Sequence, residues 1–101
     1  MKLTNAQVLR RAATYVERHG HAKMLLVDSR GRVCIAGAIN TILTGDPMKW
    51  PVRSSRLLRI VERWLFKRRK IGSDAITWNN NIHTKGKEII TALRGASRMA
   101  R

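Results

Sequence analysis

Residues 55–70 read SRLLRIVERWLFKRRK and contain the clearest helical periodicity of the chain. At about 100° per residue, the apolar side chains fall within an arc of about 120°. These side chains are Leu57, Leu58, Val61, Trp64 and Leu65. Cations fall within about 80° on nearly the opposite side, at Arg56, Arg59, Arg63, Lys67 and Lys70. The pattern predicts an amphipathic helix, with Ser54 or Ser55 as its N-cap and a basic face about 21 Å long.

Helices are also predicted on both sides of this stretch. The first spans about residues 5–19, because Thr4 is a good N-cap and Gln7 completes a capping box. A short helix of small residues is predicted over 36–44. A last amphipathic helix is predicted from residue 84 or 85 to residue 96.

Two segments lack a helical period. The run Met24–Val27 and the run Arg32–Ile35 flank residues 28–31, whose composition is typical of a turn, so we expect a β-hairpin there. Residues 73–81 are interpreted as a linker or a strand. The predicted fold class is therefore α+β and mostly α. We expect about four helices around one core, with a short hairpin between the first two helices. The chain should form one domain over residues 1–101, frayed from about residue 98.

Charge is the most unusual property of the chain. Its 21 Lys and Arg residues face 6 Asp and Glu residues, which gives a formal net charge of +15. Most of the cations are arginine, which binds phosphate in a bidentate manner and stacks on bases. A GC-rich genome would also favour arginine, but it would not explain the low number of acids. The excess is concentrated after residue 48, where the longest basic helix lies, and it favours a polyanionic partner.

Several further side chains are candidates for function. Phe66 can stack on a base or pack beneath the following loop, and the sequence favours packing. Trp50 lies between Lys49 and Pro51, where we expect it to be exposed as a stacking or anchor residue. His19, His21 and Cys34 do not have the spacing of a metal site, so no metal or other cofactor is predicted. No acid/base pair or phosphate loop is recognisable, so the protein is not predicted to be an enzyme.

Three segments, in the same order along the chain, resemble a known family. They are the helix Val8–Ala13 that closes with Glu17–Gly20, the run Gly31–Ile39, and the segment Thr77–Asn80. The chain resembles a family of small proteins of unknown function from actinobacteria and their bacteriophages. The family pattern has an acidic residue after Trp-Asn, where this chain has Asn80, and family members are less basic. The resemblance implies no activity and no cofactor, and it suggests a specialised or phage-encoded member.

The cellular compartment is predicted from the cysteine content of the chain and from its lack of long apolar segments. Cys34 is the only cysteine, so an internal disulfide is impossible and a reducing compartment is indicated. The first residues lack the apolar run of a signal peptide, and no window has the roughly eighteen apolar residues that a membrane span needs. We expect a cytoplasmic protein, located in the bacterial host if it is phage-encoded.

Together these features predict sequence-tolerant binding of nucleic acid, with DNA favoured over RNA. The residues expected to contact phosphate are Arg56, Arg59, Arg63, Lys67, Arg68, Arg69, Lys70, Lys87, Arg94 and Arg98. The alternative is a protein-interaction module that inhibits an acidic host protein of transcription or replication. A homodimer is compatible with the same sequence.

Overall fold

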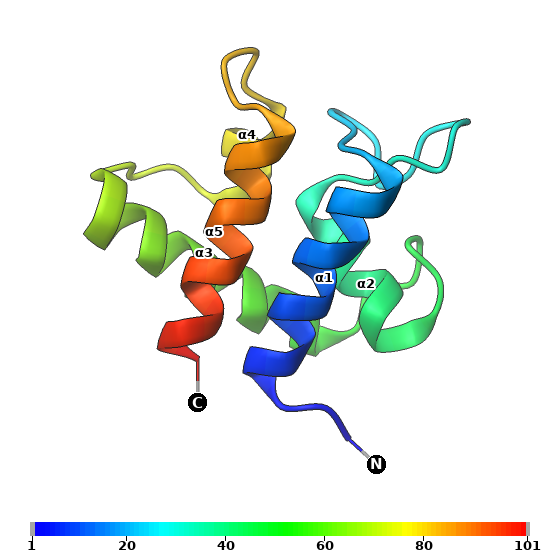
Figure 1. Ribbon diagram of the computed structural model, residues 1–101, viewed down its shortest axis with the longest axis horizontal. Helices are drawn as coiled ribbons and strands as arrows, with labels where there is room; N and C mark the ends of the chain where they lie inside the picture. The colour runs from blue at the N-terminus through cyan, green and yellow to red at the C-terminus, as the bar shows by residue number, and fades with distance from the viewer. Residues whose placement is uncertain (1, 101) are drawn as a thin grey trace.

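The computed structural model describes residues 2–100, which fold into five α-helices (Figure 1). The helices are α1 (Asn5–His19), α2 (Ile35–Thr44), α3 (Val52–Arg69), α4 (Ala75–Asn80) and α5 (Gly86–Met99). In Figure 1, α1 and α5 lie side by side and antiparallel, and they make the most extensive helix pair of the fold. α2 packs against α1, α3 passes behind α5, and the short α4 contacts both α2 and α3.

One hydrophobic core joins all five helices. Its largest fully buried apolar side chains are Leu9, Ile35, Ile39, Leu57, Leu65, Ile89 and Leu93. α4 adds Ala75 and Trp78 to the same cluster. This shared core lies on one side of α3. The apolar face of α3 packs into it, and the opposite face stays in solvent.

Local signals placed α1 correctly. The hydroxyl of Thr4 accepts a hydrogen bond from the amide of Gln7 at 3.1 Å, and the side chain of Gln7 accepts one from the amide of Thr4 at 2.8 Å. This is the predicted capping box, and it fixes the first turn of α1. At the other end of the fold, α5 is helical through Met99. The remainder of the expected frayed end, residue 101, lies outside the described residues.

The prediction of a β-hairpin is wrong. The turn at residues 28–31 forms, with the amide of Gly31 donating to the carbonyl of Asp28 at 3.0 Å, but no strands flank it. Between residues 2 and 100 there are only isolated bridges, which join Val33 to both His21 and Val27. The fold class is therefore all-helical with five helices across the described residues, and neither the α+β class nor the count of four holds.

The reason is that the pairing across the turn is not continued, because the amide and the carbonyl of Val33 form hydrogen bonds with residues 20 and 22 and not with residues 24–27. Met24 has a left-handed φ of 70°, which breaks an extended run, and its amide donates to the side chain of Asn80 at 2.8 Å. The amide of Cys34 donates to the carbonyl of Leu26. Gly37 permits this contact, because a Cβ at that position would collide with the carbonyl of Leu26. The segment is thus a loop that covers α2 and α4.

Two helix boundaries also differ from the prediction. α3 begins at Val52 with Pro51 as its N-cap, so neither Ser54 nor Ser55 caps it. Ser54 is buried, and its hydroxyl donates to the side chain of Asn40 on α2 at 2.6 Å. Residues 75–80 form α4 rather than a linker or strand, because Asp74 accepts a hydrogen bond from the amide of Thr77 at 2.9 Å and caps the helix.

Candidate functional site

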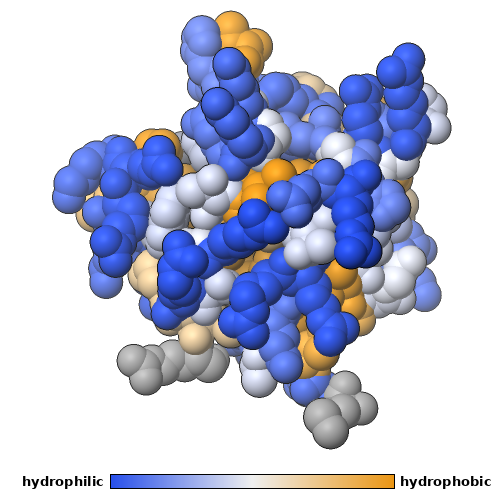
Figure 2. All heavy atoms as spheres, in the orientation of Figure 1, coloured by the Kyte–Doolittle hydropathy of each residue, from blue (hydrophilic) through white to orange (hydrophobic). Residues whose placement is uncertain are grey.

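The predicted amphipathic character of α3 is confirmed. Leu57, Leu58, Val61, Trp64 and Leu65 are all buried. The five cations on the other side are all exposed, and we call them the α3 basic face: Arg56, Arg59, Arg63, Lys67 and Lys70. Four of these cations lie on α3 itself, and Lys70 follows the last turn as a left-handed C-cap. In Figure 1 the C-terminal half of α3 projects beyond α5, and hydrophilic side chains cover that projection in Figure 2.

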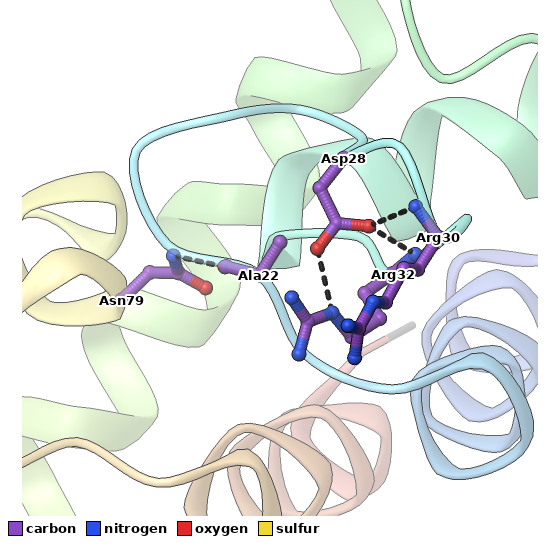
Figure 3. Close-up of polar contacts among 5 residues, drawn as sticks. All are labelled: Ala22, Asp28, Arg30, Arg32 and Asn79. Atoms are coloured by element: carbon purple, nitrogen blue, oxygen red, sulfur yellow. Dashed lines mark hydrogen bonds and ion pairs between the residues drawn. The ribbon is translucent and has the colours of Figure 1, made fainter.

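The carboxylates of the chain are all used in internal hydrogen bonds. Figure 3 shows one example, in which Asp28 accepts from the amides of Arg30 and Arg32 and from the Arg32 guanidinium. The others accept hydrogen bonds as follows: Glu17 from Arg94, Asp46 from Met48, Glu62 from Ala75, Asp74 from Thr77, and Glu88 from Lys85. Most of these donors are backbone amides at turns and helix N-termini, so the carboxylates stabilise local backbone structure.

Ion pairs are correspondingly scarce. Within residues 2–100 there are two, between Arg32 and Asp28 at 2.6 Å and between Arg94 and Glu17 at 3.2 Å. Neither involves the α3 basic face. Its cations repeat at i,i+3 and i,i+4, a spacing at which like charges destabilise a helix by about 0.2–0.5 kcal/mol per pair. A bound polyanion would remove that repulsion.

The other predicted phosphate contacts do not extend this face. At about 100° per residue, Arg68 projects roughly 140° from the centre of the face. With Arg98 it lines a hollow of about 340 Å³ between α3 and α5, beside Trp64. The guanidinium of Arg69 lies 5.5 Å from the ring centroid of Trp64, at cation–π distance. These three arginines form a second basic group, which we call the Trp64 cluster.

Two positions predicted on α5 have separate surroundings. Arg94 is engaged by Glu17 of α1, so its charge is partly compensated. Lys87 is exposed near the beginning of α5, one helix away from the α3 basic face. The single widened patch predicted from the sequence is therefore divided among the α3 basic face, the Trp64 cluster and the outer side of α5. The sequence could not show this division, because it depends on how α3 and α5 cross.

Two aromatic side chains are exposed beside the α3 basic face. Phe66 is 62% exposed, so it does not pack beneath the following loop as the sequence favoured. It borders a hollow of about 460 Å³ that Arg59 and Arg63 also line. Trp50 is 45% exposed, as predicted, and its indole N–H donates to the hydroxyl of Ser55 at 3.2 Å. Trp64 and Trp78 are buried and belong to the core.

Another hollow, of about 560 Å³, lies between the N-terminal segment and the ends of α2 and α3. Lys2, Arg11 and Arg53 line it, above an apolar floor that includes Leu3. The guanidinium of Arg53 is held in place by the side chain of Asn5 at 2.9 Å and by the carbonyl of Leu3 at 2.6 Å. This hollow has no signature in the sequence, because its cations come from three separate segments.

A polar network is buried on the side of the molecule near α4. The Asn79 side chain is fully buried, accepts from the amide of Ile35 at 2.9 Å and donates to the carbonyl of Ala22 at 3.2 Å, the second of which is drawn in Figure 3. His21 Nε2 lies 2.7 Å from Asn79 Oδ1. The ammonium of Lys23 donates to three carbonyl oxygens in residues 79–84. This network joins the 20–35 loop to α4.

The groups with potential chemical reactivity are held in structural roles. Burial lowers the pKa of His21, although its hydrogen bond with Asn79 opposes that shift. Burial raises the pKa of the Cys34 thiol, whose sulfur accepts from the amide of Gly37 and caps α2. No cluster of three or more potential metal ligands occurs among residues 2–100. Over the same residues, no helix is both long enough and apolar enough to span a membrane.

These features define a small, strongly basic, all-helical domain in which five exposed cations without an ion pair to a described residue follow one another along α3 and its C-cap. The chain belongs to a family of unknown function, DUF6197, which matches residues 1–99. The resemblance seen in the sequence to a family of unknown function is thus confirmed. No curated protein and no solved structure matches the chain.

Proposed function

We propose that the protein binds nucleic acid, with DNA favoured, through phosphate contacts made by the α3 basic face. The observation that carries this proposal is that the carboxylates of the described residues form no ion pairs with these cations. Five exposed cations follow one another along α3 and its C-cap, none forms an ion pair with a described residue, and all six carboxylates accept hydrogen bonds from other groups. A row of cations about 21 Å long suits successive phosphates, and binding releases condensed counterions.

The proposal is one of binding without strong sequence preference and without catalysis. Contacts to phosphate position a protein on nucleic acid but do not read its sequence. The α3 basic face contains only Arg and Lys, which serve phosphate well. No chemical step is included, because the Cys34 thiol is buried and the carboxylates are already hydrogen-bonded. We place the protein in the cytoplasm, where nucleic acid is accessible.

The experiment that tests the proposal is a charge reversal with a matched control. Arg59→Glu/Arg63→Glu should abolish binding of a labelled DNA duplex in fluorescence anisotropy. Arg10→Glu/Arg18→Glu makes the same change in net charge at two exposed arginines of α1, and it should leave most of the affinity intact. Both variants should melt near the wild-type temperature, because surface substitutions change stability little. Equal losses in the two variants would show that net charge, and not the α3 basic face, governs binding.

A second candidate is docking on an acidic protein of the transcription or replication machinery. It is favoured by apolar side chains exposed at the beginning of α3, namely Met48, Trp50 and Val52. Apolar anchors of this kind give protein interfaces most of their affinity. Phosphate-mediated binding should be competed by heparin and by any duplex. Docking on one protein should resist such competition and should be lost in Trp50→Ala.

A further inference from the structure

The hollow beside Phe66 has features that phosphate binding does not require. Phe66 follows Arg63 by one turn of α3, so the ring and the guanidinium groups of Arg59 and Arg63 are neighbours on the surface. The ring is 62% exposed and makes no contribution to the core. Exposed aromatic rings next to arginines are the usual platform on which single-stranded nucleic acids stack their bases.

The opposite side of the hollow is formed by the segment between α3 and α4. Ile71 is half-buried and gives this side an apolar surface, and Asp74 lies at its end. Gly72 has open space where a side chain would be, so nothing projects from it into the hollow. The hollow, of about 460 Å³, thus offers an aromatic surface, an aliphatic surface and an open entrance next to two arginines.

Two carboxylates also line the hollow, and both are held in position by α4. Glu62 accepts from the amide of Ala75 at 2.8 Å, and Asp74 accepts from the amide and hydroxyl of Thr77 at 2.9 and 2.8 Å. The hydrogen bonds from Thr77 hold the pKa of Asp74 below its ordinary value, so this carboxyl is an anion at neutral pH. An ionised carboxylate has about four acceptor positions, so each retains capacity for another donor.

The charges in and around the hollow would place the phosphate and the base of a nucleotide at different positions. A phosphate would be repelled by Glu62 and Asp74 but attracted to Arg59 and Arg63 at the entrance. A base carries no net charge, and its exocyclic amino group would donate to the carboxylates, as cytosine N4 does to Asp and Glu side chains. Thymine and uracil lack that amino group and offer the carboxylates only their N3–H. A base in a duplex is stacked and paired, so it cannot enter.

We infer that the Phe66 hollow binds an unpaired base with an exocyclic amino group, namely cytosine, adenine or guanine, of a single strand whose phosphates lie on the α3 basic face. This inference rests on the proposed function and specifies its ligand. It predicts that single strands bind more tightly than duplexes. It also predicts that oligodeoxycytidine binds more tightly than oligodeoxythymidine of the same length.

The test measures anisotropy of both labelled oligonucleotides at neutral pH with wild-type protein and variants. Phe66→Ala should weaken binding of oligodeoxycytidine by about 5- to 140-fold, which is the range for loss of one base–aromatic stack. Phe66→Trp should retain the affinity. Phe66→Leu, which keeps an apolar side chain but has no π-face, should lose it. An apolar docking site for a protein would tolerate Leu, so retention of affinity in Phe66→Leu overturns base stacking.

The role of the two carboxylates in base preference is tested by Asp74→Asn and Glu62→Gln. These replacements keep an oxygen that accepts the hydrogen bonds from α4 but remove the negative charge. Either variant should reduce the preference for oligodeoxycytidine over oligodeoxythymidine while thermal melting confirms the fold. The inference fails if wild-type protein binds both oligonucleotides equally and Phe66→Ala changes neither. If Arg59→Glu/Arg63→Glu still abolishes binding in that case, the proposed function stands without the base site. If wild-type protein binds no oligonucleotide and no duplex, both fail.

Discussion

Replacement of Asn79 by alanine should cause one of the largest losses of stability available to a polar substitution in this protein. Asn79 is 0% exposed, and its side chain links three segments of the chain. Its oxygen accepts from the amide of Ile35, the first residue of α2, and its nitrogen donates to the carbonyl of Ala22. Both backbone partners belong to buried residues, so water cannot readily replace the missing amide.

The size of the loss follows from these two partners. A buried donor or acceptor left without a partner costs about 1–3 kcal/mol, so Asn79→Ala should lower the free energy of unfolding by about 2–6 kcal/mol. A domain of this size has a total stability of about 5–15 kcal/mol. For an m-value of about 1.5 kcal/mol/M, the midpoint of urea unfolding should fall by roughly 1–4 M.

The assay is urea unfolding followed by circular dichroism, with Asn81→Ala as the control. Asn81 is exposed, and its side chain accepts only from the amide of His83, so its replacement should cost less than about 1 kcal/mol. The reasoning is refuted if the two variants shift the midpoint equally while the m-value stays constant. Such a result would mean that water or a backbone shift satisfies the partners of Asn79.

Four other outcomes are expected. The logarithm of the affinity for duplex DNA should fall linearly with the logarithm of salt concentration, with a slope of about −4.5 for five phosphate contacts. In the Arg59→Glu/Arg63→Glu variant, any measurable residual binding should show a slope of about −2.7. A wild-type slope near zero would contradict phosphate binding. Acrylamide should quench mainly the exposed Trp50, so Trp50→Phe should remove most of the quenchable fluorescence. Burial and the charge of Lys23 lower the pKa of His21, so folded protein binds fewer protons at this site than unfolded protein does. Urea unfolding should therefore show a contribution to stability that is complete above pH 6.5 and is lost as the pH falls from there toward the lowered pKa. This pH dependence should disappear in His21→Gln. Gly95→Ala would place a methyl group against the indole of Trp64, and calorimetry should show a loss of about 1–3 kcal/mol.

Local signals explain what could be predicted from the sequence. The capping box at Thr4 and Gln7 satisfies backbone groups within one turn, so it can be recognised in any context. The faces of α3 follow from a spacing that repeats over four turns, and each predicted position on the two faces is buried or exposed as expected. Asp74 three residues before Thr77 was also a readable N-cap signal, but six residues are too few for a periodicity to support it.

Long-range contacts explain what could not be predicted. The run from Met24 to Val27 has the composition of a strand, and Leu26 does accept from the amide of Cys34 across the turn, but the amide of Met24 donates to Asn80 on α4. The amide and carbonyl of Val33 bond to residues 20 and 22, so these groups do not extend a hairpin with residues 24–27. Similarly, Arg68 and Arg98 line one hollow at the place where Trp64 of α3 packs closely against Gly95 of α5. Neither contact leaves a periodic trace in the sequence.

The distribution of the acids connects the fold to the proposed function. A chain with a net charge of +15 could reduce its self-repulsion by placing its six carboxylates among its cations. Instead Glu62, which lies on α3 itself, is directed to the amide of Ala75 at the beginning of α4, and Asp74 and Glu88 serve the first turns of α4 and α5. Each of these acids stabilises a helix N-terminus, where its interaction with backbone amides is favourable. No carboxylate of the described residues forms an ion pair with the α3 basic face, so part of the repulsion among its cations remains. An anion from outside can relieve it, so binding of a polyanion and stability of the folded chain should increase together.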